Sequence, residues 1–149
     1  MKTLFQLLSN TILIAALLSW MASQLIKTIL TLFSTKRFDM ERMFGAGGMP
    51  SAHSAMVCSL AMGIANKCTV ASPQFALAVA FAGVVMYDAM GVRRAAGEQA
   101  KVINKMVDAL EKNEGSDISD KELKEYLGHT PVEVLAGALL GIIIWMIII

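Results

Sequence analysis

Long apolar segments constrain the fold of this chain more than any other feature of its sequence. Four can be drawn, from about Leu4 to Phe33, from about Ser51 to Ala65, from Pro73 to about Val92, and from Pro131 to Ile149. A helix needs about 20 apolar residues to cross a bilayer, so the second segment is short for a span. The segments predict a single domain, residues 1–149, that is an all-α integral membrane helical bundle with about four transmembrane helices.

The composition also favours a membrane protein. Of the 149 residues, 56% are hydrophobic and 17% are charged, whereas soluble domains average about 45–50% apolar and about 25% charged residues. The net charge is +1 and there is no basic tract, so no nucleic-acid partner is expected. Cys58 and Cys68 lack metal-ligand spacing, and we expect both to be free thiols.

One long polar stretch, residues 93–129, separates the third apolar segment from the fourth. Apolar residues recur along its first half at the spacing of one helix face, at Ile103, Met106, Val107 and Leu110. This spacing predicts a cytoplasmic helical extension that continues the third segment out of the membrane. Farther along, Ser119 and Glu122 form a capping-box pattern that predicts a short helix to Tyr126.

The distribution of basic residues predicts the orientation of the bundle. Ten of the 13 Lys and Arg residues lie in the loops that follow the first and third segments. Cytoplasmic loops carry an excess of Lys and Arg in membrane proteins. We therefore expect both of these loops in the cytoplasm and both termini outside, in a multi-pass protein.

The stretch from Gly47 to Ala55 reads Gly-Gly-Met-Pro-Ser-Ala-His-Ser-Ala and predicts a loop that turns into a helix. The glycine pair allows unusual backbone angles, and Pro50 suits the first helical turn, where its missing N–H costs nothing. The N–H groups of that turn, with the positive end of the helix dipole, favour a phosphate, and His53 stands beside them. The ordinary alternative is a common helix start with an incidental histidine.

Seven titratable or charged side chains fall within or at the ends of the apolar segments: Lys27, His53, Asp88, Arg93, Arg94, His129 and Glu133. Charged residues in spans are energetically expensive and indicate function by default. In a four-span topology all seven fall at one membrane face, although hydrophobicity alone set the depth of each segment. This convergence indicates a functional site more strongly than any single motif does.

Several of these residues also have a purely structural interpretation. Lys27 could extend its amine to the headgroups, and Arg93 and Arg94 could be ordinary anchors on the positive side of the membrane. Asp88 could form a structural ion pair with either arginine. Glu133 could simply close the start of the fourth helix, because it ends a capping-box pattern that has proline at the first helical position.

Two short motifs resemble those of the type 2 phosphatidic acid phosphatase and vanadium haloperoxidase superfamily. Residues 50–53, Pro-Ser-Ala-His, are similar to its Pro-Ser-Gly-His signature. The stretch from Gly128 to Gly137 resembles the last motif, in which a histidine is followed four residues later by an acid and then by Val-Leu-Ala-Gly. Together with the stretch from Tyr87 to Arg94, these motifs make most of the chain resemble a divergent, small membrane branch of that superfamily.

The chain departs from the superfamily pattern in its arginines. Counted from Lys27, the Arg-Pro pair of the first motif falls on two hydroxyl residues, and the nearest arginine is Arg37. The arginine position of the last motif is occupied by Leu123. Arg93 or Arg94 could supply the missing charge from the end of the third segment.

The resemblance implies a membrane lipid phosphatase that hydrolyses a phosphomonoester or diphosphate lipid on the cytoplasmic face. His129 would attack phosphorus and form a phosphohistidine, and Glu133 would orient its imidazole. His53 would protonate the leaving oxygen and then activate water. The groups that would hold the phosphate are Lys27, Ser51, Arg93 and Arg94, with Asp88 in a supporting role.

The expected partners are the bilayer and its lipid phosphate substrate, and the resemblance implies no required cofactor. A Mg²⁺ ion enters only if the fold brings Asp88, Glu98 and Glu133 together. The short second segment and the small number of spans also suggest a homodimer, in which a second copy completes the surface that faces the bilayer.

Three other functions are compatible with the same residues. In a different kind of membrane enzyme, Asp88 and Glu133 would bind Mg²⁺ and the histidines would be secondary. In a small transporter or proton-coupled carrier, His53, Asp88 and His129 would be relay groups. In a non-catalytic membrane scaffold, the pattern would remain without the chemistry, and substitution of either histidine would have no effect.

Overall fold

The computed structural model describes residues 2–35, 47–114, 123, 125 and 128–149. The regular elements among these residues are all α-helices. They are α1 (Lys2–Leu8), α2 (Thr11–Thr35), α4 (Ala52–Cys68), α5 (Pro73–Met90), α6 (Val92–Glu114) and α7 (Pro131–Ile148). The capping box and short helix predicted over residues 119–126 lie outside the described residues, apart from Leu123 and Glu125.

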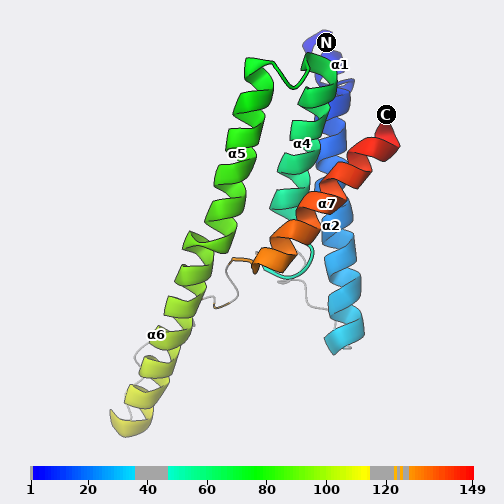
Figure 1. Ribbon diagram of the computed structural model, residues 1–149. Coiled ribbons are helices and arrows are strands. Elements are labelled where there is room, and N and C mark those ends of the chain that lie inside the picture. Colours follow the sequence, from blue (N-terminus) through cyan, green and yellow to red (C-terminus); the bar gives the residue numbers. More distant parts are fainter. Residues whose placement is uncertain (1, 36–46, 115–122, 124, 126–127) are drawn as a thin grey trace.

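When α5 and its continuation α6 are counted as one unit, successive long helices run in alternating directions, as Figure 1 shows. Both chain termini and the connection between α4 and α5 lie at one end of the bundle. The starts of α4 and α7 lie at the opposite end of the bundle. Helix α5 ends near this position, and α2 extends beyond it. The two helices that carry the histidine motifs therefore begin at the same end of the molecule.

Three segments are long and apolar enough to cross a bilayer: Thr11–Phe33, Pro73–Leu110 and Pro131–Ile148. The fourth predicted segment forms α4, which has 17 residues and contacts α2, α5 and α7. The prediction of an all-α integral membrane bundle is thus confirmed. Its shortest segment is the central helix, with neighbours on several sides.

The first apolar segment is not one helix from Leu4 to Phe33, and this expectation was wrong. The chain breaks between α1 and α2 at Ser9 and Asn10. Asn10 Oδ1 accepts a hydrogen bond from the Leu13 N–H at 3.1 Å, while Ser9 Oγ donates to the Gln6 carbonyl at 3.1 Å. Asparagine in this position caps a new helix by satisfying an N–H that lacks an intrahelical partner.

The predicted continuation of the third segment is confirmed, because α6 begins two residues after α5 ends. Gly91 lies between the two helices, and its N–H donates to the Tyr87 carbonyl at 2.8 Å. In Figure 1, α6 extends α5 well beyond the end of the bundle at which α4 and α7 begin. Ser72 caps the start of α5, since its Oγ accepts from the Phe75 N–H at 3.2 Å.

Helices α4 and α7 cross in backbone contact through two glycines. A Cβ atom at Gly137 would overlap the Ser51 carbonyl oxygen, and one at Gly141 would overlap the Ala55 carbonyl oxygen. Small residues four apart allow helices to approach this closely in membranes. The crossing fixes the start of α7 against the start of α4.

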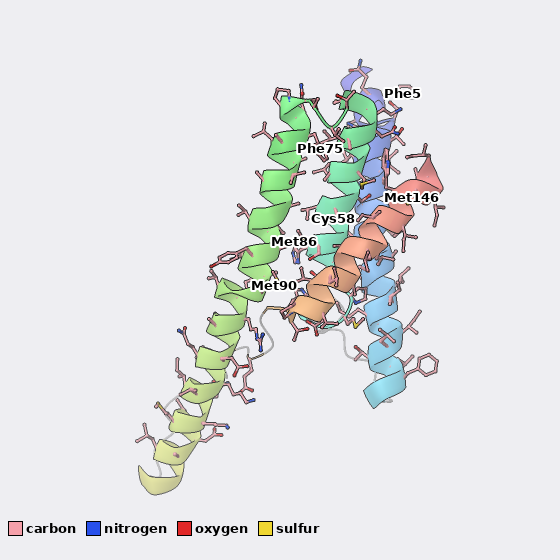
Figure 2. The ribbon with its side chains drawn as sticks, in the orientation of Figure 1. Phe5, Cys58, Phe75, Met86, Met90 and Met146 are labelled. Carbon is pink, nitrogen blue, oxygen red and sulfur yellow. The ribbon has the colours of Figure 1, made fainter. Side chains whose placement is uncertain are left out.

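The contact between α4 and α5 includes Cys58 and Met86, whose sulfur atoms are 4.0 Å apart (Figure 2). Cys58 and Cys68 are both free thiols, as expected. By contrast, Phe5 and Met146 are mostly exposed and point away from the bundle, as apolar side chains do when they face lipid (Figure 2).

Candidate active site

Hydrogen bonds to backbone carbonyls tie four helices together at the end of the bundle where α4 and α7 begin. The Ser51 N–H, just before α4, donates to the Glu133 carbonyl of α7 at 3.0 Å. The His129 N–H donates to the Ala89 carbonyl near the end of α5 at 2.8 Å. Ser23 Oγ of α2 donates to the Pro50 carbonyl at 2.9 Å. These bonds bring the two histidine motifs to one place and hold them there.

His129 is buried, with 3% of its surface exposed. Its Nδ1 lies 3.2 Å from Glu133 Oε2. A carboxylate can only accept here, so Nδ1 carries the proton and Nε2 of the neutral ring carries a lone pair. Nε2 is buried and has no hydrogen-bond partner among the described residues. The ring is therefore oriented through one nitrogen and unpaired at the other.

Glu133 has both of the roles that the sequence left open. Its Oε2 also accepts from the Thr130 N–H at 3.0 Å, and Thr130 Oγ1 accepts from the Glu133 N–H at 3.4 Å. This is the predicted capping box, with Pro131 at the first helical position. The same oxygen closes the start of α7 and fixes the imidazole of His129, so the structural role does not exclude the functional one.

Lys27 is buried on α2, with 4% of its surface exposed, and does not extend to solvent as a headgroup anchor would. Its methylene groups lie against the turn at Gly48, where an added Cβ would be 3.4 Å from Lys27 Cδ. Among the described residues it makes no ion pair within salt-bridge distance. Its charge nevertheless acts on Glu133, His129 and His53. The site thus contains one buried ammonium group beside the nucleophile candidate.

His53 is the second residue of α4 and is exposed. The charges that act on it come from Arg93, His129, Lys27 and Asp88, which belong to four different parts of the chain. His53 therefore shares the site with His129, as expected from the order of the helices. The ring of His129 is on the buried side of this group of residues, and the ring of His53 is on its exposed side.

The turn before α4 differs from the sequence-based expectation in the position of Pro50. Gly47 and Gly48 have positive φ angles of 107° and 81°, as a glycine pair predicted. However, the helix begins at Ala52, so Pro50 precedes the capping residue and does not lie in the first helical turn. A serine is a strong helix cap, and the helix start moves to follow it.

Ser51 is fully buried, and its polar atoms form hydrogen bonds within the bundle. Its Oγ accepts from the Ser54 N–H at 3.4 Å and lies 3.0 Å from Ser54 Oγ, while its own N–H is bonded to the Glu133 carbonyl. A phosphate at this helix start would meet the next two N–H groups, those of Ala52 and His53. The contribution of Ser51 is to cap α4 and to join it to α7.

Asp88 selects Arg93 as its partner. Arg93 Nε lies 2.6 Å from Asp88 Oδ2, and both side chains are partly exposed. Arg94 makes no ion pair with another described residue, and its backbone packs against Gly128 so closely that a Cβ there would overlap the Arg94 nitrogen. The charge of Arg93 acts on His53. Arg37 lies outside the described residues.

Burial is the main influence on the pKa of His129, and it lowers that pKa below the ordinary value of 6.5. The hydrogen bond to Glu133 opposes this effect, and the positive charge of Lys27 adds to it. The Gly48 carbonyl also favours the protonated ring, although its geometry does not meet that of a hydrogen bond. The balance leaves His129 neutral at pH 7, the form that can act as a nucleophile.

The carboxylates expected to bind Mg²⁺ are not gathered in the fold. Asp88 pairs with Arg93 and Glu133 contacts His129, while Glu98 lies on α6 beyond them. Within the described part of the chain, no group of three or more His, Cys, Asp or Glu side chains could hold a metal ion.

Sequence reasoning missed the contribution of Ser23. The buried residues Ser19, Ser23 and Lys27 occur four apart along an otherwise apolar helix. That spacing places them on one face, so a polar stripe leading to Lys27 could have indicated which face of α2 meets the site.

Known proteins resemble this chain over nearly its whole length. The family model described as the divergent PAP2 family matches residues 8–144. An uncharacterized membrane protein, YuiD of Bacillus subtilis (strain 168), is 40% identical over 152 residues, which cover 96% of each chain. No solved structure matches the chain. The chain therefore belongs to the divergent PAP2 family of membrane proteins.

Proposed function

We propose that this membrane protein is a lipid phosphatase, which hydrolyses a phosphomonoester or diphosphate lipid through a phosphohistidine at His129. The observation that supports it most is the unpaired, buried Nε2 atom of a ring that Glu133 holds through Nδ1. Buried polar atoms are rarely left without a partner, and such exceptions require an explanation. A nucleophilic nitrogen that bonds to phosphorus during the reaction would explain this unpaired atom.

In the first step, the Nε2 lone pair of His129 attacks phosphorus and the bond from phosphorus to the lipid oxygen breaks. His53 donates its proton to that leaving oxygen as a general acid. The His129 ring gains positive charge as the N–P bond forms, and the carboxylate of Glu133 stabilises it. The products of this step are the released lipid alcohol or lipid monophosphate and the phosphohistidine.

In the second step, the now neutral His53 takes a proton from a water molecule, whose oxygen attacks phosphorus. The N–P bond breaks, its electron pair returns to Nε2, and orthophosphate leaves. His53 has then regained the proton that it gave up, and His129 is again neutral. The cycle balances without a cofactor.

Three groups are suited to the negative charge of the transferred phosphoryl oxygens. Lys27 supplies a buried ammonium, Arg93 a guanidinium held by Asp88, and the start of α4 the N–H groups of Ala52 and His53. Phosphoryl transfer depends mainly on such positioning and charge. Because His129 is buried and His53 is exposed, the phosphate end of the lipid would enter the site first. The rest of the lipid would remain on the side of His53.

The substrate would lie in the cytoplasmic leaflet, because the positive-inside rule assigns the basic loops to that side. Both termini would then lie outside. The site is at an end of the bundle and not at its middle (Figure 1), as an enzyme that takes its substrate from a bilayer surface requires.

The direct test is phosphate release from a panel of lipid phosphates in detergent, with wild type, His129→Ala and His53→Ala side by side. Phosphatidic acid, phosphatidylglycerophosphate and a polyprenyl diphosphate cover the expected classes. We expect both variants to lose at least about a thousandfold in kcat/KM, since histidine removal disables the chemical step. Lys67→Ala is the control, because this exposed lysine lies near the far end of α4.

The same assay separates the alternatives. Full activity in both histidine variants would remove the proposed mechanism. Loss of activity on EDTA addition, with little effect of His129→Ala, would favour a Mg²⁺ enzyme. Substrate flux across vesicles without phosphate release would favour a carrier, and neither flux nor phosphate release from any lipid would favour a scaffold.

A further inference from the structure

Asn104, on α6, binds the stretch of chain that leads to His129. Its Nδ2 donates to the Leu123 carbonyl at 2.9 Å and to Glu125 Oε1 at 3.0 Å, and its Oδ1 accepts from the Leu123 N–H at 3.0 Å. A side-chain amide offers the same donor and acceptor as a peptide group. Asn104 therefore pairs with Leu123 in both directions, which fixes the position of that residue along α6.

Two further contacts fasten the chain just before the site. Gly128 has a φ angle of 85° and packs on the backbone of Arg94 so closely that no side chain fits between them. The next residue, His129, donates its N–H to the Ala89 carbonyl at 2.8 Å. Residues 123, 128 and 129 thus contact α6 and α5 in the reverse of their order in the chain.

Only a short length of chain separates the two outer anchors, Leu123 and Gly128. Asn104 and Arg94 are ten residues apart on one helix, which corresponds to about 15 Å along its axis. Residues 123 and 128 are five residues apart, and five residues reach at most about 17 Å. A shift at Asn104 would therefore be felt at Gly128 and His129.

We propose that Asn104 is a positioning residue for His129: it holds Leu123 in register on α6 and so keeps the imidazole in its buried place against Glu133. Asn104 lies ten residues along α6 from Arg94 and has no contact with the reacting groups. Its effect on catalysis rests on the proposed function, but its effect on the placement of the ring does not.

The two histidines of the chain make this proposal testable without an activity assay. Diethylpyrocarbonate modifies accessible, neutral imidazoles, and peptide mass spectrometry can follow each histidine separately. In wild type we expect rapid modification of the exposed His53 and protection of the buried His129. In Asn104→Ala we expect His129 to react about tenfold faster, because losing one or two net hydrogen bonds shifts local opening by about that factor. His53 should be unchanged.

Two comparisons guard against a merely structural effect. Lys105→Ala, at an exposed neighbouring position, should leave His129 protected. Asn104→Asp should expose His129 because it places a second carboxylate beside Glu125, and adding Glu125→Gln should restore protection by supplying a donor again. This pair also gives the answer if Asn104→Ala does not fold.

Protection of His129 in Asn104→Ala equal to that in wild type would overturn the proposal, as would the absence of rescue in the double variant. Phosphate release measured on the same samples keeps the two claims apart. If no lipid is hydrolysed but His129 reactivity changes as expected, the proposed function fails and the role of Asn104 is supported. If lipids are hydrolysed but His129 reactivity does not change, the reverse holds.

Discussion

At the scale of single residues, Glu133 shows how a site can be built from an ordinary helix start. One carboxylate oxygen accepts from the Thr130 N–H and also faces Nδ1 of His129. Because the capping box fixes Glu133 and His129 lies four residues earlier in the chain, the carboxylate orients the ring through Nδ1. The contact between these two residues could be predicted from their spacing and the family resemblance.

Other residue-level features could not be predicted. The choice of Arg93 over Arg94 as the partner of Asp88 depends on the bend at Gly91, because adjacent residues on a helix point about 100° apart. The burial of Lys27 depends on the turn at Gly48 that covers it. Hydrophobicity sets the depth of a lysine in a span, but not which neighbours enclose it.

The pKa of His129 gives a prediction about pH. Burial holds this pKa below 6.5, so the acid limb of the kcat/KM profile, on which the nucleophile becomes protonated, should lie below pH 6.5. Glu133 raises the pKa of His129 and Lys27 lowers it. Glu133→Gln should therefore move the acid limb to lower pH, and Lys27→Met should move it to higher pH.

Both variants should also be slower, by about a hundredfold or more, since each removes charge stabilisation of the reaction. Gln remains compatible with the capping box, so the start of α7 should persist in Glu133→Gln. The measurement is kcat/KM against pH for the three proteins. Shifts of the acid limb in the same direction in both variants would contradict this account of His129.

At the scale of elements, the apolar segments predicted the helices, but the breaks and contacts of these helices could be predicted only in part. The α4–α7 contact was foreseeable, because Gly137 and Gly141 are four residues apart in an apolar helix. The break at Asn10 was not foreseen, since the apolar pattern continues across it. A single capping residue determines where the new helix begins. Helix α4 is short, and its place at the centre of the bundle depends on neighbours that the sequence alone does not assign.

The glycine contacts predict how three substitutions should differ. Gly137→Ala and Gly141→Ala should each destabilise the protein by about 1–3 kcal/mol, because a Cβ at either position meets the backbone of α4. Gly83→Ala is the matched control, since nothing lies within 4 Å of its added Cβ. Alanine is the better helix former, so this variant should be as stable as wild type or more so.

Thermal unfolding in one detergent compares the three variants directly. Gly137→Ala should also lose phosphatase activity, because Ser51 joins α4 to the carbonyl of Glu133. Equal melting temperatures for Gly137→Ala and Gly83→Ala would show that the close crossing does not matter for stability.

At the scale of the whole molecule, the proposed site depends on the alternating directions of the apolar segments. The second and fourth apolar segments run the same way, so their first residues lie at one end, as Figure 1 shows. This arrangement followed from the number of segments alone. Which side of the membrane that end faces rests on the Lys and Arg distribution, and the homodimer likewise stays a prediction.

The native cysteines test the orientation. Cys68 is exposed at the end of α4 opposite His53, whereas Cys58 is partly buried within the bundle. A membrane-impermeant maleimide added to intact spheroplasts should label Cys68, and Cys68→Ser should abolish the labelling. Labelling that requires permeabilised membranes would reverse the orientation and place the histidines on the outer surface.

The most direct test of the whole account is to trap the phosphorylated enzyme. Wild type and His53→Ala are mixed with a lipid phosphate that wild type hydrolyses, quenched in alkali, and analysed by peptide mass spectrometry. We expect a phosphoryl group on His129, with a longer lifetime in His53→Ala because no base activates the water. Steady phosphate release by wild type with His129 never phosphorylated would contradict the account.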